Sequence, residues 1–235
     1  MPQVEHHYLP PGVDYKFIRS PDYPDRQAGW TKVIMTKEML KSHEIVLTVD
    51  SDATMVNLEL PLEWLMNFWE VTKDFSIALA LDPDLDENLD SKGNIDLNTG
   101  FVFNRQGKRT QEIYNAWAEC PTERRFQGCG KWKWDYLREQ TAFAEYIRYD
   151  YADDIRVLPC TEANGYPQHD LCKGLFVRHP WTDKNLVKPN FAESVLEAFV
   201  PLLHQAFTQE AIIDFKNKTL HNAVLLDPEE DFDDD

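Results

Sequence analysis

Apolar segments of two kinds alternate along the chain. Short runs rich in β-branched and aromatic residues predict strands at 45–49, 75–81, 101–103, 155–158 and 175–177. Longer segments with apolar residues at helical spacing predict helices at 30–40, 60–69, 111–118, 136–148 and 191–207. Because strands alternate with helices, this pattern predicts an α/β fold with a mainly parallel, Rossmann-like sheet flanked by helices.

The two ends of the chain differ from this middle part. Residues 1–29 contain five prolines and predict a loop-rich stretch with one short strand at 15–18. Residues 227–235 contain seven acidic residues, which predict a disordered acidic tail. We therefore expect a single domain over residues 1–226. Residues 82–93 lack the glycine and the terminal glutamate at the offsets that a calcium loop requires, so we expect a solvated acidic loop there.

Composition narrows the classes of function. The chain has 235 residues, of which 43% are hydrophobic, enough for one substantial core. A net charge of −17 with no basic stripe argues against nucleic acid as a partner. No stretch approaches the ~20 apolar residues that span a bilayer, and residues 1–7 lack the features of a signal peptide. We expect neither a membrane segment nor a targeting signal in this chain.

Four cysteines allow two interpretations. None has the CxxC spacing of zinc or redox sites. Pairing Cys120 with Cys129 and Cys160 with Cys172 would close two short loops and would suit an oxidising lumen; four buried free thiols are the alternative. The triplet 217–219 (Asn-Lys-Thr) is a glycosylation sequon, although such triplets also arise by chance.

Two carboxylates follow the strand at 45–49. Asp50 and Asp52 lie one residue apart, and residues i and i+2 of an extended chain share a face. Ligands bind beyond the carboxyl ends of such strands, and two acids there are good ligands for a hard divalent cation. The structural alternative is that they cap a following turn or helix.

Three further groups of polar residues are individually weak signals. Asn98 and Gly100 precede the strand at 101–103 and predict a strand-entry turn that can approach a ligand closely. Glu139 and Gln140 lie in a predicted helix, where surface positions are the default. His179 ends a late strand and Lys184 follows it, which offers a nitrogen ligand and a phosphate contact.

The order of these motifs is more informative than any one of them. Asp-Ser-Asp-Ala after a strand, Asn-Thr-Gly before a strand, Glu-Gln-Thr-Ala-Phe on a helix and His-Pro-Trp-Thr-Asp-Lys after a late strand together resemble the GT-A nucleotide-sugar transferases. The nearest resemblance is to the galactosyl-, mannosyl- and xylosyltransferases of glycosyltransferase family 34. It includes Trp-Thr-Lys-Val at 30–33, like that family's W-x-K-V, and covers about residues 8–207.

The resemblance implies a role for each candidate. Asp50, Asp52 and His179 would hold Mn²⁺ (or Mg²⁺) against the diphosphate of a nucleoside-diphosphate sugar. Lys184 would touch the phosphates, and Asn98 and Gly100 would line the donor-sugar pocket. The two positions Glu139 and Gln140 fall beside the reacting sugar carbon. The implied activity is transfer of a hexose or pentose to a glycan or glycoprotein acceptor with retention, in the Golgi lumen, where family members are anchored.

Two features depart from the family pattern. The metal motif lies at residues 50–52, whereas complete members of the family have about twice as many residues, plus a membrane anchor, before it. We therefore expect a shortened member that lacks the first strand–helix unit and binds the sugar donor weakly. His179 is followed by Pro180 and Trp181, where the family usually has a glycine soon after the histidine.

Two other functions stay open. Asp50 and Asp52 also fit the D-x-D-x-T motif of haloacid-dehalogenase-like phosphatases, as nucleophile and acid/base, with Asp153 and Asp154 as a later acidic pair. That pair precedes a strand instead of following one. The non-catalytic alternative is a binding module that keeps the glycosyltransferase fold and takes up metal without turnover.

Overall fold

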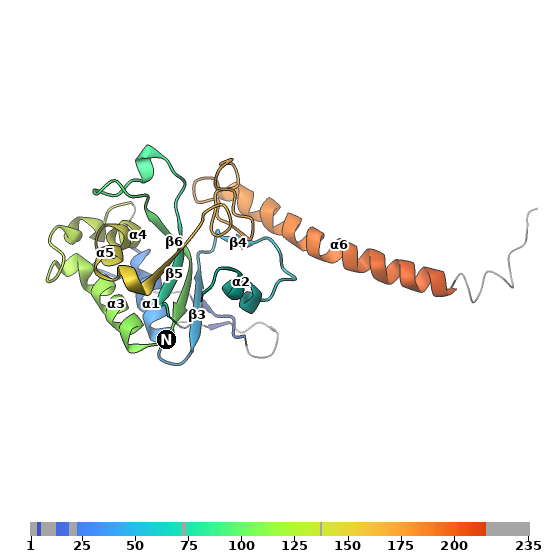
Figure 1. Cartoon of the computed structure of the whole chain (residues 1–235), viewed down its shortest axis with the longest axis horizontal. Helices are drawn as coiled ribbons and strands as arrows, with labels where there is room; N and C mark the ends of the chain where they lie inside the picture. Colours follow the sequence, from blue (N-terminus) through green and yellow to red (C-terminus); the bar gives the residue numbers. More distant parts are fainter. Residues whose placement is uncertain (1–3, 6–12, 19–22, 72–73, 137, 215–235) are drawn as a thin grey trace, which may run out of the picture.

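The computed structural model describes residues 4–5, 13–18, 23–71, 74–136 and 138–214. Its centre is a four-stranded sheet in the order β3-β6-β5-β7 (Figure 1). The strands are β3 (Ile45–Val49), β5 (Ile77–Leu81), β6 (Leu97–Arg105) and β7 (Ile155–Leu158). The predicted α/β class, with parallel pairing in the central sheet, is confirmed.

One strand direction differs from the expected sheet. β5 and β7 pair in parallel, whereas β6 is antiparallel to both β3 and β5. The reason lies in the connection from β5 to β6, which contains only the 3₁₀ turn Asp86–Asn88. A parallel return requires a crossover, usually a helix, and this connection has none. The result is that β3, β5 and β7 point the same way while β6 opposes them.

Helices cover both faces of this sheet. One face packs against α1 (Trp30–Met39), α3 (Lys108–Glu119) and α4 (Arg138–Ala142), which continues through the π-helical turn Phe143–Ile147 into α5 (Arg148–Asp150). The other face packs against α2 (Leu62–Phe68). Residues of β5 alternate between the two cores, as a strand requires: Leu79 faces the first, and Ala78 and Ala80 face the second.

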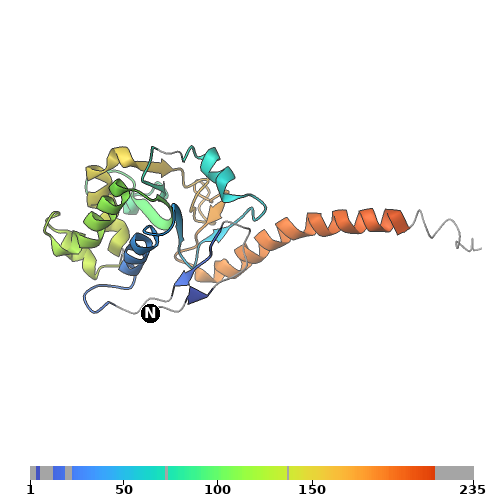
Figure 2. The ribbon, with the colours of Figure 1, turned by 90° about the horizontal axis from the view of Figure 1, so that it is seen from below.

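Smaller elements surround this body. β1 (Val4–Glu5) pairs with β2 (Phe17–Ile18), and β4 (Thr54–Met55) pairs with β8 (Val177–Arg178). Further 3₁₀ turns lie at Cys120–Thr122, Cys129–Lys133, Ala152–Asp154 and Lys184–Leu186. The long helix α6 (Val187–Asp214) contacts β4 at its base and projects from the body, as Figures 1 and 2 show.

The expected turn at Asn98 and Gly100 is wrong. Both residues lie inside β6, which begins at Leu97. The polar residues there are accommodated by an irregular register, since Leu79 pairs with Val102 whereas its neighbour Ala80 pairs with Asn98. This bulge gives extra backbone to β6 opposite β5 and keeps the strand continuous. The apolar pattern predicted only the second half of β6, because 101–103 is the only uninterrupted apolar run within this strand.

Both cysteine pairs are disulfides in the structure. Cys120 bonds to Cys129 and Cys160 to Cys172, with Cα–Cα separations of 5.6 and 5.0 Å. This is the lumenal interpretation of the two that the sequence left open. The sequon at 217–219 and the acidic tail at 227–235 lie outside the described residues. Among the described helices, none has the length and apolarity to cross a bilayer.

The first prediction concerns the core. Leu79 is fully buried on β5, and its register partner Val157 on β7 is 41% exposed. Leu79→Ala removes buried methyl groups and leaves a cavity, so we expect it to lower the free energy of unfolding by ~2–5 kcal/mol. Val157→Ala, the matched control, should lower it by less than ~1 kcal/mol. Urea unfolding followed by circular dichroism measures both; equal effects would contradict the placement of the core.

Candidate metal centre and active site

Asp50 and Asp52 lie where β3 ends. The Asp50 N–H donates to the Gly100 carbonyl (2.8 Å), which extends the β3–β6 ladder by one residue. The chain then turns, because the Ala53 N–H donates back to the Asp50 carbonyl (3.0 Å). β4 follows directly and pairs with β8, which ends one residue before His179. This small two-stranded sheet therefore brings His179 to the two aspartates across a long stretch of sequence.

These three residues form a compact donor set. His179 Nε2 lies 3.1 Å from Asp52 Oδ1 and 4.0 Å from Asp50 Oδ2. One ligand atom from each residue lies within 4.8 Å of the others, and no other such group of three occurs in the part of the chain that the structure describes. Two carboxylates and an imidazole at this separation can hold a divalent metal ion.

Hydrogen bonds keep Asp52 ionised. Burial alone would raise the pKa of Asp52, but hydrogen bonds from His179 and Lys184 hold it well below its usual range. Lys184 forms an ion pair with Asp52 Oδ2 from the 3₁₀ turn that precedes α6. Its side chain is 69% exposed, so this ammonium group can leave the aspartate for another anion.

A glycine makes room for the imidazole. A Cβ atom at Gly100 would lie closer than 3.0 Å to Cε1 and Nδ1 of His179. The ring therefore packs directly on the β6 backbone, and only glycine permits that approach. Nδ1 of His179 is buried without a hydrogen-bond partner among the described residues. The role of Gly100 visible in the structure is thus to seat the metal-binding ring.

Lys32 joins the metal group to Glu139. Its ammonium group lies 3.0 Å from both carboxylate oxygens of Asp50 and 3.0 Å from Glu139 Oε1. Burial alone would lower the pKa of Lys32, but the charges of Glu139 and Asp50 raise it above its usual range. Glu139 is itself buried, and its Oε2 has no partner among the described residues. The structure thus brings Glu139 into the site through one shared cation.

The remaining two candidates belong to a buried amide network. Asn98 Nδ2 donates to Asp82 Oδ1 (2.6 Å), and Gln140 Nε2 donates to Asp82 Oδ2 (2.8 Å). Asn98 Oδ1 accepts from the Gly100 N–H (2.9 Å) and from Asn164. Burial raises the pKa of Asp82 to about 6. This network fixes the backbone on which His179 packs.

All of the candidate site residues therefore lie in one region. Two of their partners, Lys32 and Asp82, are not among the candidates predicted from the sequence. Lys32 stands out in the sequence only as part of the Trp-Thr-Lys-Val motif. Asp82 carries the same signal as Asp50, an acid that directly ends an apolar strand, and that signal could have found it. The expected solvated loop at 82–93 is wrong at two of its acids, because Asp82 and Asp90 are buried.

The later acidic pair is far from this region. Asp153 and Asp154 precede β7, and the Asp154 carbonyl accepts from Ser76, which precedes β5. They lie at the starting ends of β5 and β7, whereas Asp50 follows the end of β3, which runs in the same direction. The pairing that a haloacid-dehalogenase-like site requires is therefore absent from the structure.

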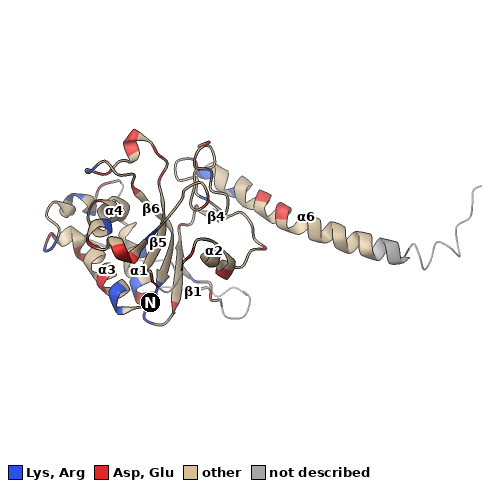
Figure 3. Ribbon diagram, viewed as in Figure 1, with Lys and Arg blue, Asp and Glu red and all other residues tan. Residues whose placement is uncertain are grey.

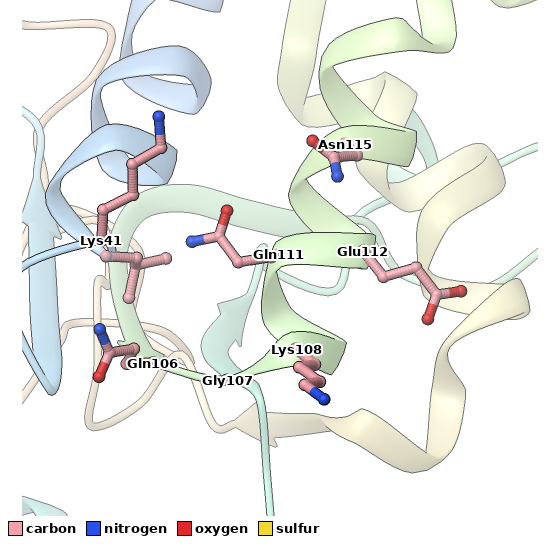
Figure 4. Close-up of a pocket in the computed structure, with 8 residues that line it drawn as sticks. Lys41, Gln106, Gly107, Lys108, Gln111, Glu112 and Asn115 are labelled. Atoms are coloured by element: carbon pink, nitrogen blue, oxygen red, sulfur yellow. The ribbon is translucent and has the colours of Figure 1, made fainter.

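A surface hollow of about 650 Å³ lies at the starting end of α3 (Figure 4). Its lining includes Lys41, Gln106, Lys108 and Gln111. Gln106, Lys108 and Gln111 follow the end of β6 at Arg105, away from Gly100, whereas Lys41 follows α1. None of the four belongs to the metal group. The hollow is therefore separate from the candidate site.

Comparisons with known proteins agree with this fold. No family model and no curated protein matches the chain. A solved structure that does match is described as a glycosyltransferase involved in the glycosylation of the major capsid of PBCV-1. The TM-score is 0.50 at 15% identity, over 74% of this chain and 81% of that one. The expected glycosyltransferase fold is confirmed, and membership of family 34 stays a prediction.

The second prediction tests the seat of His179. Gly100→Ala places a methyl group against the ring, so we expect Mn²⁺ binding at least ~10-fold weaker than in the natural protein. Gly107→Ala is the matched control, because a Cβ there would lie 3.8 Å from its nearest neighbour, an ordinary contact. Isothermal titration with Mn²⁺ measures both. Unchanged affinity in the first variant would show that the ring is not a ligand.

The third prediction concerns a buried acid beside this network. Burial, with the charges of Asp82 and Asp90, raises the pKa of Asp96 to about 7. The raised value means that Asp96 contributes stability at low pH and that this contribution is lost as the pH rises through about 7. Asp96→Asn removes the ionisation, so its stability should fall less between pH 5 and pH 8 than that of the natural protein.

Urea midpoints at the two pH values test this expectation. Asp84→Asn, in an exposed position of the same loop, is the control and should leave the difference unchanged. An identical pH dependence in Asp96→Asn and the natural protein would show that this carboxyl does not titrate in that window.

Proposed function

We propose that the chain is a metal-dependent glycosyltransferase of the family 34 type. It would move a hexose or pentose from a nucleoside-diphosphate sugar to a glycan or glycoprotein acceptor, with retention. The observation that carries the proposal is the convergence of Asp50, Asp52 and His179 beside Lys184 and Glu139, in a fold similar to that of a known glycosyltransferase.

The donor set suits the proposed ion. Asp50, Asp52 and His179 offer hard oxygen ligands and one imidazole nitrogen, and the ring already has a seat on Gly100. When bound, Mn²⁺ or Mg²⁺ would supply Lewis-acid stabilisation of the diphosphate as its negative charge develops. The mixed oxygen and nitrogen set favours Mn²⁺ over Mg²⁺, which prefers oxygen ligands alone.

Lys184 supplies the second positive charge at the leaving group. Its exposed ammonium group already pairs with Asp52, one of the proposed metal ligands. A donor diphosphate held at the metal would lie within reach of the same group, which would move from the carboxylate to a phosphate oxygen. A fixed positive charge at that point lowers the barrier to departure of the nucleoside diphosphate.

Glu139 is the proposed group beside the reacting sugar carbon. Lys32 fixes its Oε1, while its buried Oε2 has no hydrogen-bond partner among the described residues. A carboxylate there stabilises the positive charge that develops on the sugar ring. Asn98 and Gln140 are both anchored on Asp82, so we assign them to the wall of the donor-sugar pocket.

The disulfides bear on where the protein works. Two disulfide bonds form and persist in oxidising compartments. We propose the Golgi lumen as the location, in keeping with the family that the motifs resemble. The glycan or glycoprotein acceptors of the proposed reaction are found in the same compartment.

The fourth prediction tests the activity. Asp52→Ala removes one proposed metal ligand and the partner of Lys184, so we expect loss of Mn²⁺-dependent release of nucleoside diphosphate by ~10³-fold or more. Cooperative unfolding should persist. A panel of nucleoside-diphosphate sugars with glycan acceptors measures the activity, with Asp84→Asn as the matched acidic control and EDTA as the metal-free control.

Each result decides between the alternatives. Undiminished transfer by Asp52→Ala would refute the assignment of the metal centre. Uptake of Mn²⁺ by the natural protein without transfer or donor hydrolysis would identify a binding module with this fold instead of an enzyme. Metal-dependent phosphate release from a simple ester would favour the phosphatase.

A further inference from the structure

The outer part of α6 exposes an unusual number of large apolar side chains. Seven of them between residues 191 and 207 are each 53% to 73% exposed: Phe191, Leu196, Phe199, Val200, Leu202, Leu203 and Phe207. Only the base of the helix is covered, where Asn190 and Ser194 are buried. We call the seven residues the α6 stripe. Exposed apolar surface of this extent marks an interaction site in soluble proteins.

The stripe occupies one side of the helix. At 100° per residue all seven side chains fall within about half of the circumference. Leu196, Phe199 and Leu203 are separated by three and four residues, the spacing that packs one helix against another. Glu197 and Gln205 lie on the other half, and so does Pro201, so the proline ring does not interrupt the stripe.

The charge on α6 argues against an anionic membrane as the occupant. Helices that lie on membranes carry Lys or Arg on their polar side. The only Lys or Arg in α6 is Lys188, at the base, whereas Glu193 and Glu197 lie further along, on the polar half. Figure 3 shows these charges near the body and an uncharged stretch beyond them. With a net charge of −17, the chain would be repelled by acidic lipids.

We propose that the α6 stripe is the interface of a homodimer, in which α6 of one copy packs against α6 of a second. A continuous apolar stripe is complementary to itself, so a two-fold axis buries the same surface on both copies. The stripe offers on the order of 600 Å² per copy, estimated from the typical areas of such side chains. Two copies then bury ~1,200 Å², the lower limit for a specific interface.

The small area also indicates the kind of interface to expect. Interfaces at this lower limit are typical of weak or transient complexes, so we expect a reversible dimer. Because α6 projects away from the metal group, dimerisation requires neither donor nor metal. The proposal is therefore independent of the proposed activity.

Sedimentation velocity of the full chain, from about 1 to about 200 µM, tests it. We expect a concentration-dependent shift from monomer to dimer. Leu203→Glu should raise the dissociation constant at least ~10-fold, because it places a charge at the centre of the stripe. Gln205→Glu is the matched control: it adds the same charge two residues away, on the other half of the helix, and should change the constant by less than ~2-fold. Leu196→Glu repeats the test two turns nearer the base.

Three results would overturn the proposal. The first is a monomer throughout the concentration range. The second is an equal effect of Leu203→Glu and Gln205→Glu in proteins whose circular dichroism shows an intact fold. The third is flotation of the natural protein, but not of Leu203→Glu, with vesicles of neutral phosphatidylcholine, which would identify a lipid surface as the occupant.

Discussion

The buried ammonium group of Lys32 holds together three parts of the molecule that are distant in sequence. It contacts Asp50 at the end of β3, Glu139 at the start of α4 and the carbonyl of Thr99 in β6. Removing one partner from a largely buried ion pair is strongly destabilising, so we expect each of these contacts to contribute to the stability of the others. The geometry of the candidate site follows from this one cation, because it fixes both the proposed metal ligand and the proposed catalytic carboxylate.

Two residues of β6, Asn98 and Gly100, position the other parts of the candidate site. Asn98 carries a hydrogen-bond network to Asp82 and Asn164, while Gly100 presents bare backbone to the His179 ring. The bulge opposite β5 lets a strand rich in aromatic core residues hold these polar positions as well. Strand irregularities of this kind are common beside functional sites because they redirect side chains without ending the pairing.

The molecule combines a well-packed body with an unpartnered helix. Two apolar cores lie on the two faces of the sheet, and the candidate site lies at the end of the sheet where β3 stops. Beyond its base, no other described residue covers the outer part of α6. Its sequence is nevertheless apolar on one half, and exposed apolar surface of this extent is typical of contact sites.

The sequence by itself determined the α/β class, β3 and β7 to the residue, and the candidate acids, because these depend on local periodicity and on residue chemistry. The tertiary structure alone decided that β6 runs against its neighbours and that Asn98 and Gly100 lie within it, because strand direction depends on long-range pairing. It also decided that Lys32 and Asp82 join the site. Asp82 ends an apolar strand, as Asp50 does, but the partners of Lys32 and Asp82 are distant in sequence, and no local pattern pairs them.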